Sequence, residues 1–214
     1  METAALKGSG PRDVCTRRST DSGTSWGPLD VLVKDAGQDT AVWDDVSKTV
    51  VLQFDSEASG GGRTNQQVTS TDMGLTYSAP VPQTGGQTGA STGPGRGLQL
   101  SKTNPHAPGR LLFIGHKGAY VQDFIWFSDD HGKTYTISKT PTGDSLPLMD
   151  EAQLVELKNG HVLASMRNRV QQGGGTPLPP APAPPHGGNV THATCCGFPV
   201  KPANHSKAAV QAAW

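Results

Sequence analysis

Residues 128–135 read Ser-Asp-Asp-His-Gly-Lys-Thr-Tyr, and the same eight-residue pattern occurs at 19–26 as Ser-Thr-Asp-Ser-Gly-Thr-Ser-Trp and at 70–77 as Ser-Thr-Asp-Met-Gly-Leu-Thr-Tyr. The shared pattern is Ser-x-Asp-x-Gly-x-Ser/Thr-aromatic. The Asp carboxylate accepts hydrogen bonds from backbone N–H groups two residues on, and the Gly supplies the positive φ of a tight turn. Each copy therefore predicts a β-hairpin tip with its aromatic ring packed beneath the turn.

The spacing of the copies indicates a repeated supersecondary unit. The Asp positions lie 51 and 58 residues apart, close to the roughly 40 to 50 residues of a four-stranded propeller blade. Three unrelated turns are the alternative, and the constant pattern disfavours it. We expect the Asp residues on a common rim and the aromatic residues largely buried. The fixed positions are Asp21, Gly23 and Trp26; Asp72, Gly74 and Tyr77; and Asp130, Gly132 and Tyr135.

Composition supports an all-β protein and excludes some partners. The 214 residues carry a net charge of zero, so nothing favours a nucleic acid or an anionic membrane as partner. With 27 glycines, 17 prolines and 34% hydrophobic residues, the chain is rich in turns. It contains no apolar run near the roughly 20 residues of a membrane span, and its first residues lack the pattern of a secretory signal. The three cysteines form neither a zinc spacing nor an even disulfide framework.

Several runs rich in β-branched or apolar residues predict strands. They cover 14–18, 29–33, 48–54, 110–116 and 124–127. The run at 110–116 is almost continuously apolar, which is typical of an inner strand buried on both sides. Residues 56–63 contain three consecutive glycines and predict an insertion at a hairpin tip.

The stretch from 149 to 168 predicts a hairpin with charged residues at its open end. Asn159-Gly160 between two apolar runs favours a two-residue type I′ turn, in which Lys158 faces His161. In that register Arg167 lies opposite Ala152, with Glu151 as its neighbour. Strand alternation sends Glu151 and Arg167 to opposite faces unless Glu151 sits at a bulge or in an irregular segment before the strand.

The three copies resemble the Asp boxes of the sialidase (neuraminidase) family, whose members are six-bladed β-propeller glycosidases. In that family the boxes are structural turns remote from the sugar. The resemblance extends over about residues 14 to 168 and includes the Asn/Asp-Glu-x-Gln-x-x-Glu-Leu pattern, which begins at Asp150, and the strand that ends at Arg167. It implies an exo-α-sialidase acting on glycoproteins, gangliosides or oligosaccharides, with no cofactor or metal. Family members occur in several compartments, so localisation stays open.

The resemblance also assigns site residues. Glu151 corresponds to the base that activates a tyrosine nucleophile, and Arg167 to one of three arginines that bind the sialic acid carboxylate. Gln99 ends a Gly-Pro-Gly-x-Gly-x-Gln element that leads toward the pocket, and His116 and Tyr120 belong to a stretch that contributes to the pocket wall. The alternatives are a surface Glu and Arg at a strand edge, a plain loop histidine and tyrosine, and a non-catalytic Asp-box propeller that binds carbohydrate or another partner.

Parts of the family pattern have no counterpart in these residues. The Arg-Ile-Pro segment with the first arginine and the Asp general acid are not found, and no tyrosine follows Tyr135. We therefore expect about three of six blades, no measurable hydrolysis, and self-association through two open blade edges. The expected organisation is a loose lead-in at 1–13, a partial propeller at 14–170 and a disordered Pro/Gly-rich tail at 171–214.

Overall fold

The computed structural model describes residues 12–57, 63–85, 90–117, 122–138 and 149–168. Every regular element in these ranges is a β-strand, so the predicted all-β class is confirmed. None of the described residues forms a helix that could cross a membrane. The expected tail at 171–214 and most of the lead-in at 1–13 lie outside the described residues.

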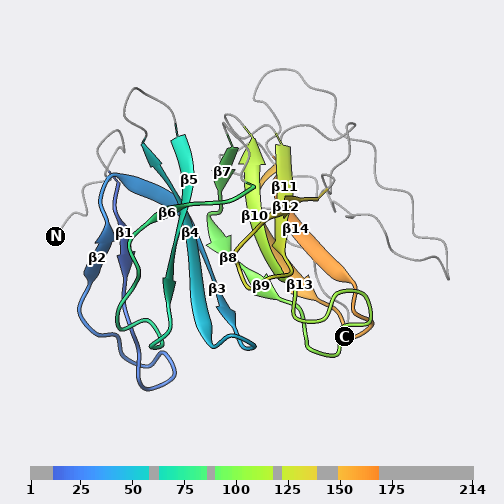
Figure 1. Cartoon of the computed structure of the whole chain (residues 1–214), viewed down its shortest axis with the longest axis horizontal. Helices are drawn as coiled ribbons and strands as arrows, with labels where there is room; N and C mark the ends of the chain where they lie inside the picture. Colours follow the sequence, from blue (N-terminus) through green and yellow to red (C-terminus); the bar gives the residue numbers. More distant parts are fainter. Residues whose placement is uncertain (1–11, 58–62, 86–89, 118–121, 139–148, 169–214) are drawn as a thin grey trace, which may run out of the picture.

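Four sheets follow one another in chain order (Figure 1). The first sheet pairs β1 (Val14–Thr16) with β2 (Asp30–Val33). The second contains β3 (Ala36–Asp44), β4 (Thr49–Glu57), β5 (Arg63–Ser70) and β6 (Val81–Pro82), with β8 (Gly95–Arg96) parallel to β3. The third contains β7 (Ala90–Thr92), β9 (Leu98–Gln99), β10 (Leu111–Lys117), β11 (Gln122–Ser128) and β12 (Thr136–Ile137). The fourth pairs β13 (Met149–Glu156) with β14 (Val162–Asn168).

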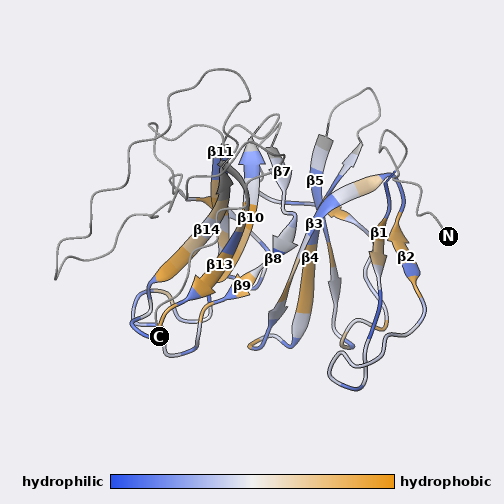
Figure 2. Ribbon diagram, turned by 180° about the vertical axis from the view of Figure 1, so that it is seen from behind, coloured by the Kyte–Doolittle hydropathy of each residue, from blue (hydrophilic) through white to orange (hydrophobic). Residues whose placement is uncertain are grey.

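Apolar cores lie between successive sheets, and apolar residues are concentrated along the strands (Figure 2). Each core takes side chains from two neighbouring sheets, so the sheets stack face to face. The core between the first and second sheets contains Val14, Ala36, Leu52, Phe54 and Val68. The next contains Val42, Val51, Leu111, Phe113, Phe124, Trp126 and Tyr135, and the last contains Ile114, Ala152 and Met166.

Each predicted strand run falls on a strand of the structure, but β3, β5 and the short strands β6, β7, β8, β9 and β12 were not predicted. The apolar run at 110–116 forms β10, which is buried from Leu111 to His116 as predicted. β3 has no clear strand signal, because its first half contains Gly37, Gln38 and Asp39 and bulges between Gly37 and Thr40. At the predicted 56–63 insertion, β4 continues to Glu57 and β5 begins at Arg63, and 58–62 lie outside the described residues.

In every box the Asp carboxylate accepts from the backbone N–H and the hydroxyl of the Ser or Thr four residues on. In the second and third boxes it also accepts from the N–H three residues on, whereas in the first box that N–H, of Thr24, donates to the backbone carbonyl of Asp21.

In the second box, Asp72 Oδ1 accepts from the backbone N–H groups of Leu75 at 3.0 Å and Thr76 at 2.9 Å, and Oδ2 accepts from Thr76 Oγ1 at 2.6 Å. The Ser70 hydroxyl donates to Asp72 and accepts from the Gly74 N–H, both at 2.8 Å. The bonded N–H groups thus lie three and four residues beyond the Asp, and not two as predicted, because the Ser hydroxyl takes the N–H of the Gly.

Two consecutive residues of each box have positive φ. The glycines were predicted to do so, with values of 87°, 80° and 83° in the three boxes. The residue before each glycine also does, at Ser22 (57°), Met73 (60°) and His131 (63°). Two left-handed residues in succession make a sharper reversal than the single one predicted.

Burial of the box aromatic residues differs from the prediction. Tyr135 is buried and Tyr77 is half-buried, but Trp26 is 59% exposed. The Trp26 ring lies near Gly23 of its own turn. Its box joins β1 to β2 in a two-stranded sheet, whereas the box of Tyr135 faces the second sheet, which supplies the apolar cover that Trp26 does not have.

The boxes join β1 to β2, β5 to β6 and β11 to β12, and all three lie at the same end of the sheets, which we call the box end (Figure 1). The β13–β14 turn lies at this end too. The opposite end, where β13 begins and β14 stops, is called the far end.

Candidate functional site

The β13–β14 hairpin carries the two residues predicted to do chemistry. Its loop differs from the predicted type I′ turn, because the Leu157 N–H donates to the His161 carbonyl at 2.8 Å and three residues lie between them. Gly160 alone of these three has a positive φ, of 81°, which fits a three-residue loop with a left-handed glycine. Lys158 therefore does not face His161, and the pairing shifts by one residue.

The shift changes the partner of Arg167. In the structure Arg167 pairs with Asp150 and not with Ala152, and the register slips again between Asp150 and Gln153. Glu151 lies within this bulge. The bulge is the irregularity that alternation required if Glu151 and Arg167 are to face one pocket. The backbone of both residues lies at the far end, away from the boxes.

The side chain of Gln153 in β13 packs directly on the backbone of Gly95 in β8. A Cβ on Gly95, whose φ is 149°, would lie 2.4 Å from Gln153 Nε2 and within 3.3 Å of the other amide atoms. The Gln153 side chain therefore occupies the space that a side chain at position 95 would need. This close contact explains why a glycine stands at position 95.

Buried polar side chains gather at the far end of the second and third sheets. Asp55, His116 and Asp123 are each no more than 2% exposed, and His116 pairs with Asp123 across β10 and β11. Asp55 Oδ1 accepts from the Thr92 N–H at 3.1 Å, and His116 Nδ1 lies 3.1 Å from the Gly93 carbonyl oxygen. These contacts fix the 92–93 segment beside the strand ends.

The sequence prediction included His116 but missed the two aspartates. Each aspartate lies in a largely apolar strand run, and this pattern could have identified it. A carboxylate in such a strand is rarely buried without hydrogen-bond partners. His116 lies within the sheet as a buried residue, while Tyr120 lies outside the described residues.

Gln99 does not lie with these residues. Its Nε2 donates to Asp44 Oδ1 at 2.6 Å and to the Gly109 carbonyl at 3.3 Å, and its Oε1 accepts from the Asp45 N–H at 2.7 Å. These partners belong to the β3–β4 turn and the 101–109 loop at the box end. The Gln99 amide therefore holds this turn at the box end, and the structure does not bring it together with Glu151 and Arg167.

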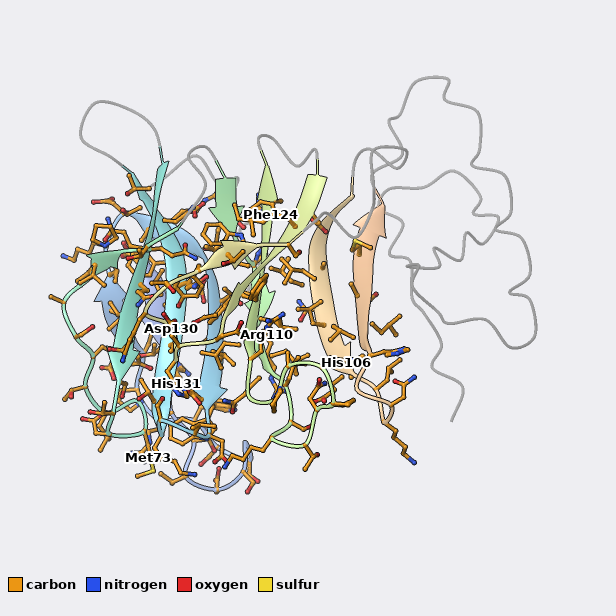
Figure 3. All side chains as sticks on the ribbon, turned by 45° about the vertical axis from the view of Figure 1, so that its right-hand side comes forward. Met73, His106, Arg110, Phe124, Asp130 and His131 are labelled. Atoms are coloured by element: carbon orange, nitrogen blue, oxygen red, sulfur yellow. The ribbon has the colours of Figure 1, made fainter. Side chains whose placement is uncertain are left out.

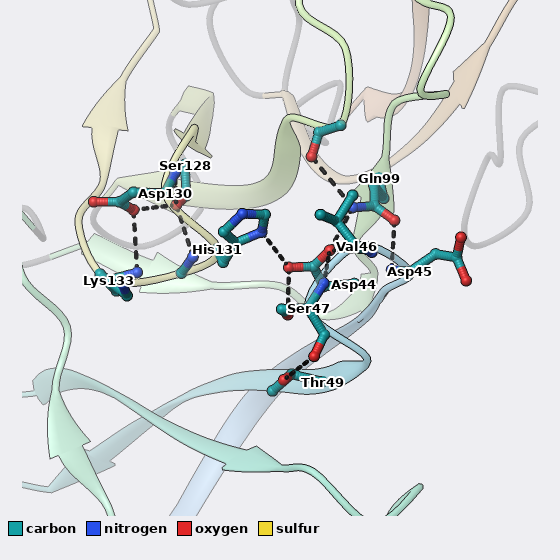
Figure 4. Close-up of polar contacts among 12 residues, drawn as sticks. Asp44, Asp45, Val46, Ser47, Thr49, Gln99, Ser128, Asp130, His131 and Lys133 are labelled. Atoms are coloured by element: carbon teal, nitrogen blue, oxygen red, sulfur yellow. Dashed lines mark hydrogen bonds and ion pairs between the residues drawn. The ribbon is translucent and has the colours of Figure 1, made fainter.

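The Asp44 carboxylate is the centre of a polar network at the box end (Figure 4). Asp44 is fully buried and accepts from Ser47 Oγ at 2.6 Å, from the Val46 N–H at 2.9 Å and from Gln99. Its Oδ2 lies 2.7 Å from Nδ1 of His131. Burial raises the pKa of Asp44, but the hydrogen bonds from Ser47, Val46, His131 and Gln99 outweigh it, and the net pKa is lowered.

A third contact region joins the fourth sheet to the 101–109 loop. Glu156 accepts from the Ser101 N–H at 2.7 Å, from Ser101 Oγ at 2.9 Å and from Asn104 Nδ2 at 2.8 Å. Glu156 thus has a structural role at the box end, remote from Glu151. In the described ranges, no group of three or more His, Cys, Asp or Glu side chains could hold a metal ion.

The BNR repeat-like domain family matches residues 5–176, which is most of the chain. The chain belongs to the BNR-repeat sialidase family. A curated sialidase of Micromonospora viridifaciens is 33% identical over 198 residues, covering 77% of this chain and 29% of that protein.

Solved structures show the same fold for this sialidase-family chain. The Hadza microbial sialidase Hz136 superposes with a TM-score of 0.60 at 23% identity, over 73% of this chain and 36% of that one. The intramolecular trans-sialidase from Ruminococcus gnavus, solved with oseltamivir carboxylate, gives 0.57 at 15% identity, over 73% and 59%. The chain therefore spans less than two thirds of each relative.

Proposed function

We propose that this sialidase-family chain recognises terminal sialic acid on glycoproteins, gangliosides or oligosaccharides. In this proposal Arg167 binds the carboxylate of the sugar, and Glu151 takes the position of the base that activates a tyrosine. The observation that carries the proposal is the bulge between Asp150 and Gln153, which brings the backbone of Glu151 beside the Asp150–Arg167 pair at the far end. Family membership supports the substrate class.

The chemistry suits the residue types. A guanidinium presents a planar fork that can bind both oxygens of a carboxylate. A tyrosine with a pKa near 10 needs an adjacent base before it can attack a glycosidic carbon, and glycosidases with a tyrosine nucleophile depart from the usual pair of carboxylates.

The described tyrosines do not fit the role of nucleophile. Tyr135 donates to Gln67 Oε1 at 2.7 Å, and burial raises its pKa. Tyr77 is half-buried in the second box, and burial followed by the charge of Asp72 raises its pKa. Because a base and one arginine act only with their missing partners, we expect these 214 residues to bind sialic acid weakly and not to hydrolyse a sialoside measurably.

The test measures binding and turnover separately. Saturation-transfer NMR with the methyl α-glycoside of N-acetylneuraminic acid should detect binding to the 214-residue chain. Arg167→Ala should abolish the signal, Glu151→Gln should keep it, and Arg18→Ala, an exposed arginine at the box end, serves as the control. Binding that survives Arg167→Ala would favour a non-catalytic carbohydrate module, and turnover of a fluorogenic sialoside would contradict the expected inactivity.

A further inference from the structure

The two-stranded sheets at the ends of the described chain are different halves of the same unit. In the second sheet the order is β6-β5-β4-β3, with a box between β5 and β6 and a plain turn between β3 and β4. The pair β1–β2 has a box between its strands and so corresponds to β5–β6. The pair β13–β14 has a plain turn and so corresponds to β3–β4. Among the described residues β1 pairs with β2 alone and β14 with β13 alone.

We propose that two copies of this chain associate head to tail, with β14 of one copy paired antiparallel to β1 of the other. Each such pairing completes a four-stranded sheet in the order β13-β14 followed by β1-β2 of the partner copy. The edges of β1 and β14 that no other described strand covers then gain hydrogen-bond partners, which is the usual basis of strand addition. Two such junctions close a ring that contains the two complete sheets of each copy and two shared sheets.

Apolar residues lie uncovered where this packing would bury them. Trp43 shares the face of β3 that turns toward the first sheet, since Val42 belongs to the opposite core, and Trp43 remains 40% exposed. The β1–β2 pair packs on Ala36 and Ala41 of β3 as well as on Leu52, Phe54 and Val68 of β4 and β5, but it leaves Trp43 near the end of β3 partly uncovered.

The fourth sheet offers the complementary surface. Leu154 and Ala164 face the third sheet, so their neighbours Val155 and Leu163, which pair with each other, point to the other side. Val155 is 49% exposed. When β1 of a partner copy extends this sheet, that side turns toward the partner's Trp43. The net charge of zero sets up no general repulsion between copies.

The boxes fix the expected register. The first Ser of the third box, Ser128, pairs with Leu111 at the start of β10, and Ser70 likewise pairs with Val50 near the start of β4. By the same rule Ser19 lies opposite Val162 of the partner copy, which places Cys15 opposite Met166. This register also matches the faces, because Cys15 points away from its own core while Met166 points to the third sheet.

The first test is the mass of the unaltered chain in solution. Light scattering after size exclusion, at micromolar and submillimolar concentrations, should give twice 22.3 kDa, and a monomer at every concentration would overturn the proposal. Val155→Asp should raise the dissociation constant by about 100-fold, because it buries an unpaired carboxylate in the shared sheet. Val81→Asp, at a valine of similar exposure on β6, should leave the dimer intact. Equal effects of the two substitutions would also overturn it.

The second test checks the register by a disulfide between copies. With Cys195 and Cys196 replaced by Ser and Cys15 kept, Met166→Cys should form a covalent dimer under mild oxidation, because directly opposed residues have Cβ atoms about 5 Å apart. Ser165→Cys is the control, since its side chain points to the other face. A covalent dimer with Ser165→Cys but not with Met166→Cys would contradict the proposed pairing.

Discussion

Single side chains decide how tightly each turn of this protein is held. In the third box, Asp130 accepts from the Lys133 N–H at 3.1 Å, from the Thr134 N–H at 2.9 Å and from Thr134 Oγ1 at 2.6 Å. Its neighbour Asp129 faces solvent, in a two-point ion pair with Arg110. Arg110, Asp130 and His131 are labelled in Figure 3. We therefore expect Asp130 to contribute more to the stability of the fold than Asp129.

Asp130→Ala should lower the free energy of unfolding by about 2 to 3 kcal/mol, because it removes a charged acceptor from several donors of one turn. Asp129→Ala should cost about 0.5 kcal/mol, which is usual for an exposed ion pair. Urea unfolding followed by tryptophan fluorescence measures both. Equal losses would show that the box carboxylate does not hold the turn.

Gly115 is a second residue whose identity is set by its neighbours. A Cβ at this position would lie 2.5 Å from Trp126 Nε1, 2.7 Å from Phe124 Cζ and 2.8 Å from the Ser91 carbonyl oxygen. Gly115→Ala should therefore destabilise the protein by about 1 to 3 kcal/mol through overpacking.

Gly37→Ala is the matched control for this substitution. A Cβ there meets only Arg12 side-chain atoms, at 3.5 and 3.7 Å, and the change should be nearly neutral. Thermal unfolding of the two variants separates them, and a neutral Gly115→Ala would mean that the stacked Phe124 and Trp126 rings can move aside.

At the scale of elements, the box end works as a set of ties between sheets. Asp44 at the end of β3 reaches His131 in the third box, and Gln67 of β5 donates to the Gly132 carbonyl at 2.9 Å and accepts from the Tyr135 hydroxyl at 2.7 Å. The third box is therefore attached to the second sheet at several points. The third box, which the sequence predicts only as a local turn, is thus part of the interface between the second and third sheets.

Asp44→Asn should cost about 2 to 4 kcal/mol of stability, because one carboxylate oxygen becomes an NH2 group that faces donors in a buried site. Asp45→Asn, at the adjacent and exposed aspartate that pairs with Lys48 and Lys102, should change stability little. Chemical unfolding compares the two. A small effect of Asp44→Asn would contradict the buried tie.

Local sequence patterns predicted single strands and turns better than they predicted strand register or contacts between sheets. The apolar run of β10 and the three box turns could be read from the sequence, because short-range chemistry determines them. The β13–β14 register was wrong by one residue, since Asn159-Gly160 suits both a two-residue and a three-residue loop and only the φ values separate them. The Asp44–His131 contact joins residues 87 apart in the chain and depends on how two sheets pack, which no local pattern encodes.

At the scale of the whole molecule, carboxylates with lowered pKa values are spread over all three boxes. Hydrogen bonds from Ser25 and Ser19 lower the pKa of Asp21 to about 2. Burial raises that of Asp130, but bonds from Thr134 and Ser128 outweigh it and bring it to about 2. The pKa of Asp72 is lowered in the same way by Thr76 and Ser70. The folded state therefore favours the charged form of each box.

Stability should consequently fall in acid. A carboxyl group whose pKa is lower in the folded state stabilises the fold fully above its unfolded pKa, near 4, and loses that contribution as the pH falls through the folded value. The urea midpoint should be level near neutral pH and should fall between about pH 5 and pH 2. A midpoint that rises or stays constant over this interval would contradict the role of these carboxylates.

The residue between Asp and Gly in each box has one further consequence. The backbone there repeats almost without change, yet Met73 is 65% exposed while His131 reaches the buried Asp44 of another sheet. The geometry of the turn is therefore constant, while the side chain at this one position is free to make or to lack a contact with another sheet. Replacing residues 128–135 by the sequence of residues 70–77 would keep the shape of the turn and remove the contact between His131 and Asp44. A single substitution at this position can thus change which sheets are linked, without changing the residues that form the turn.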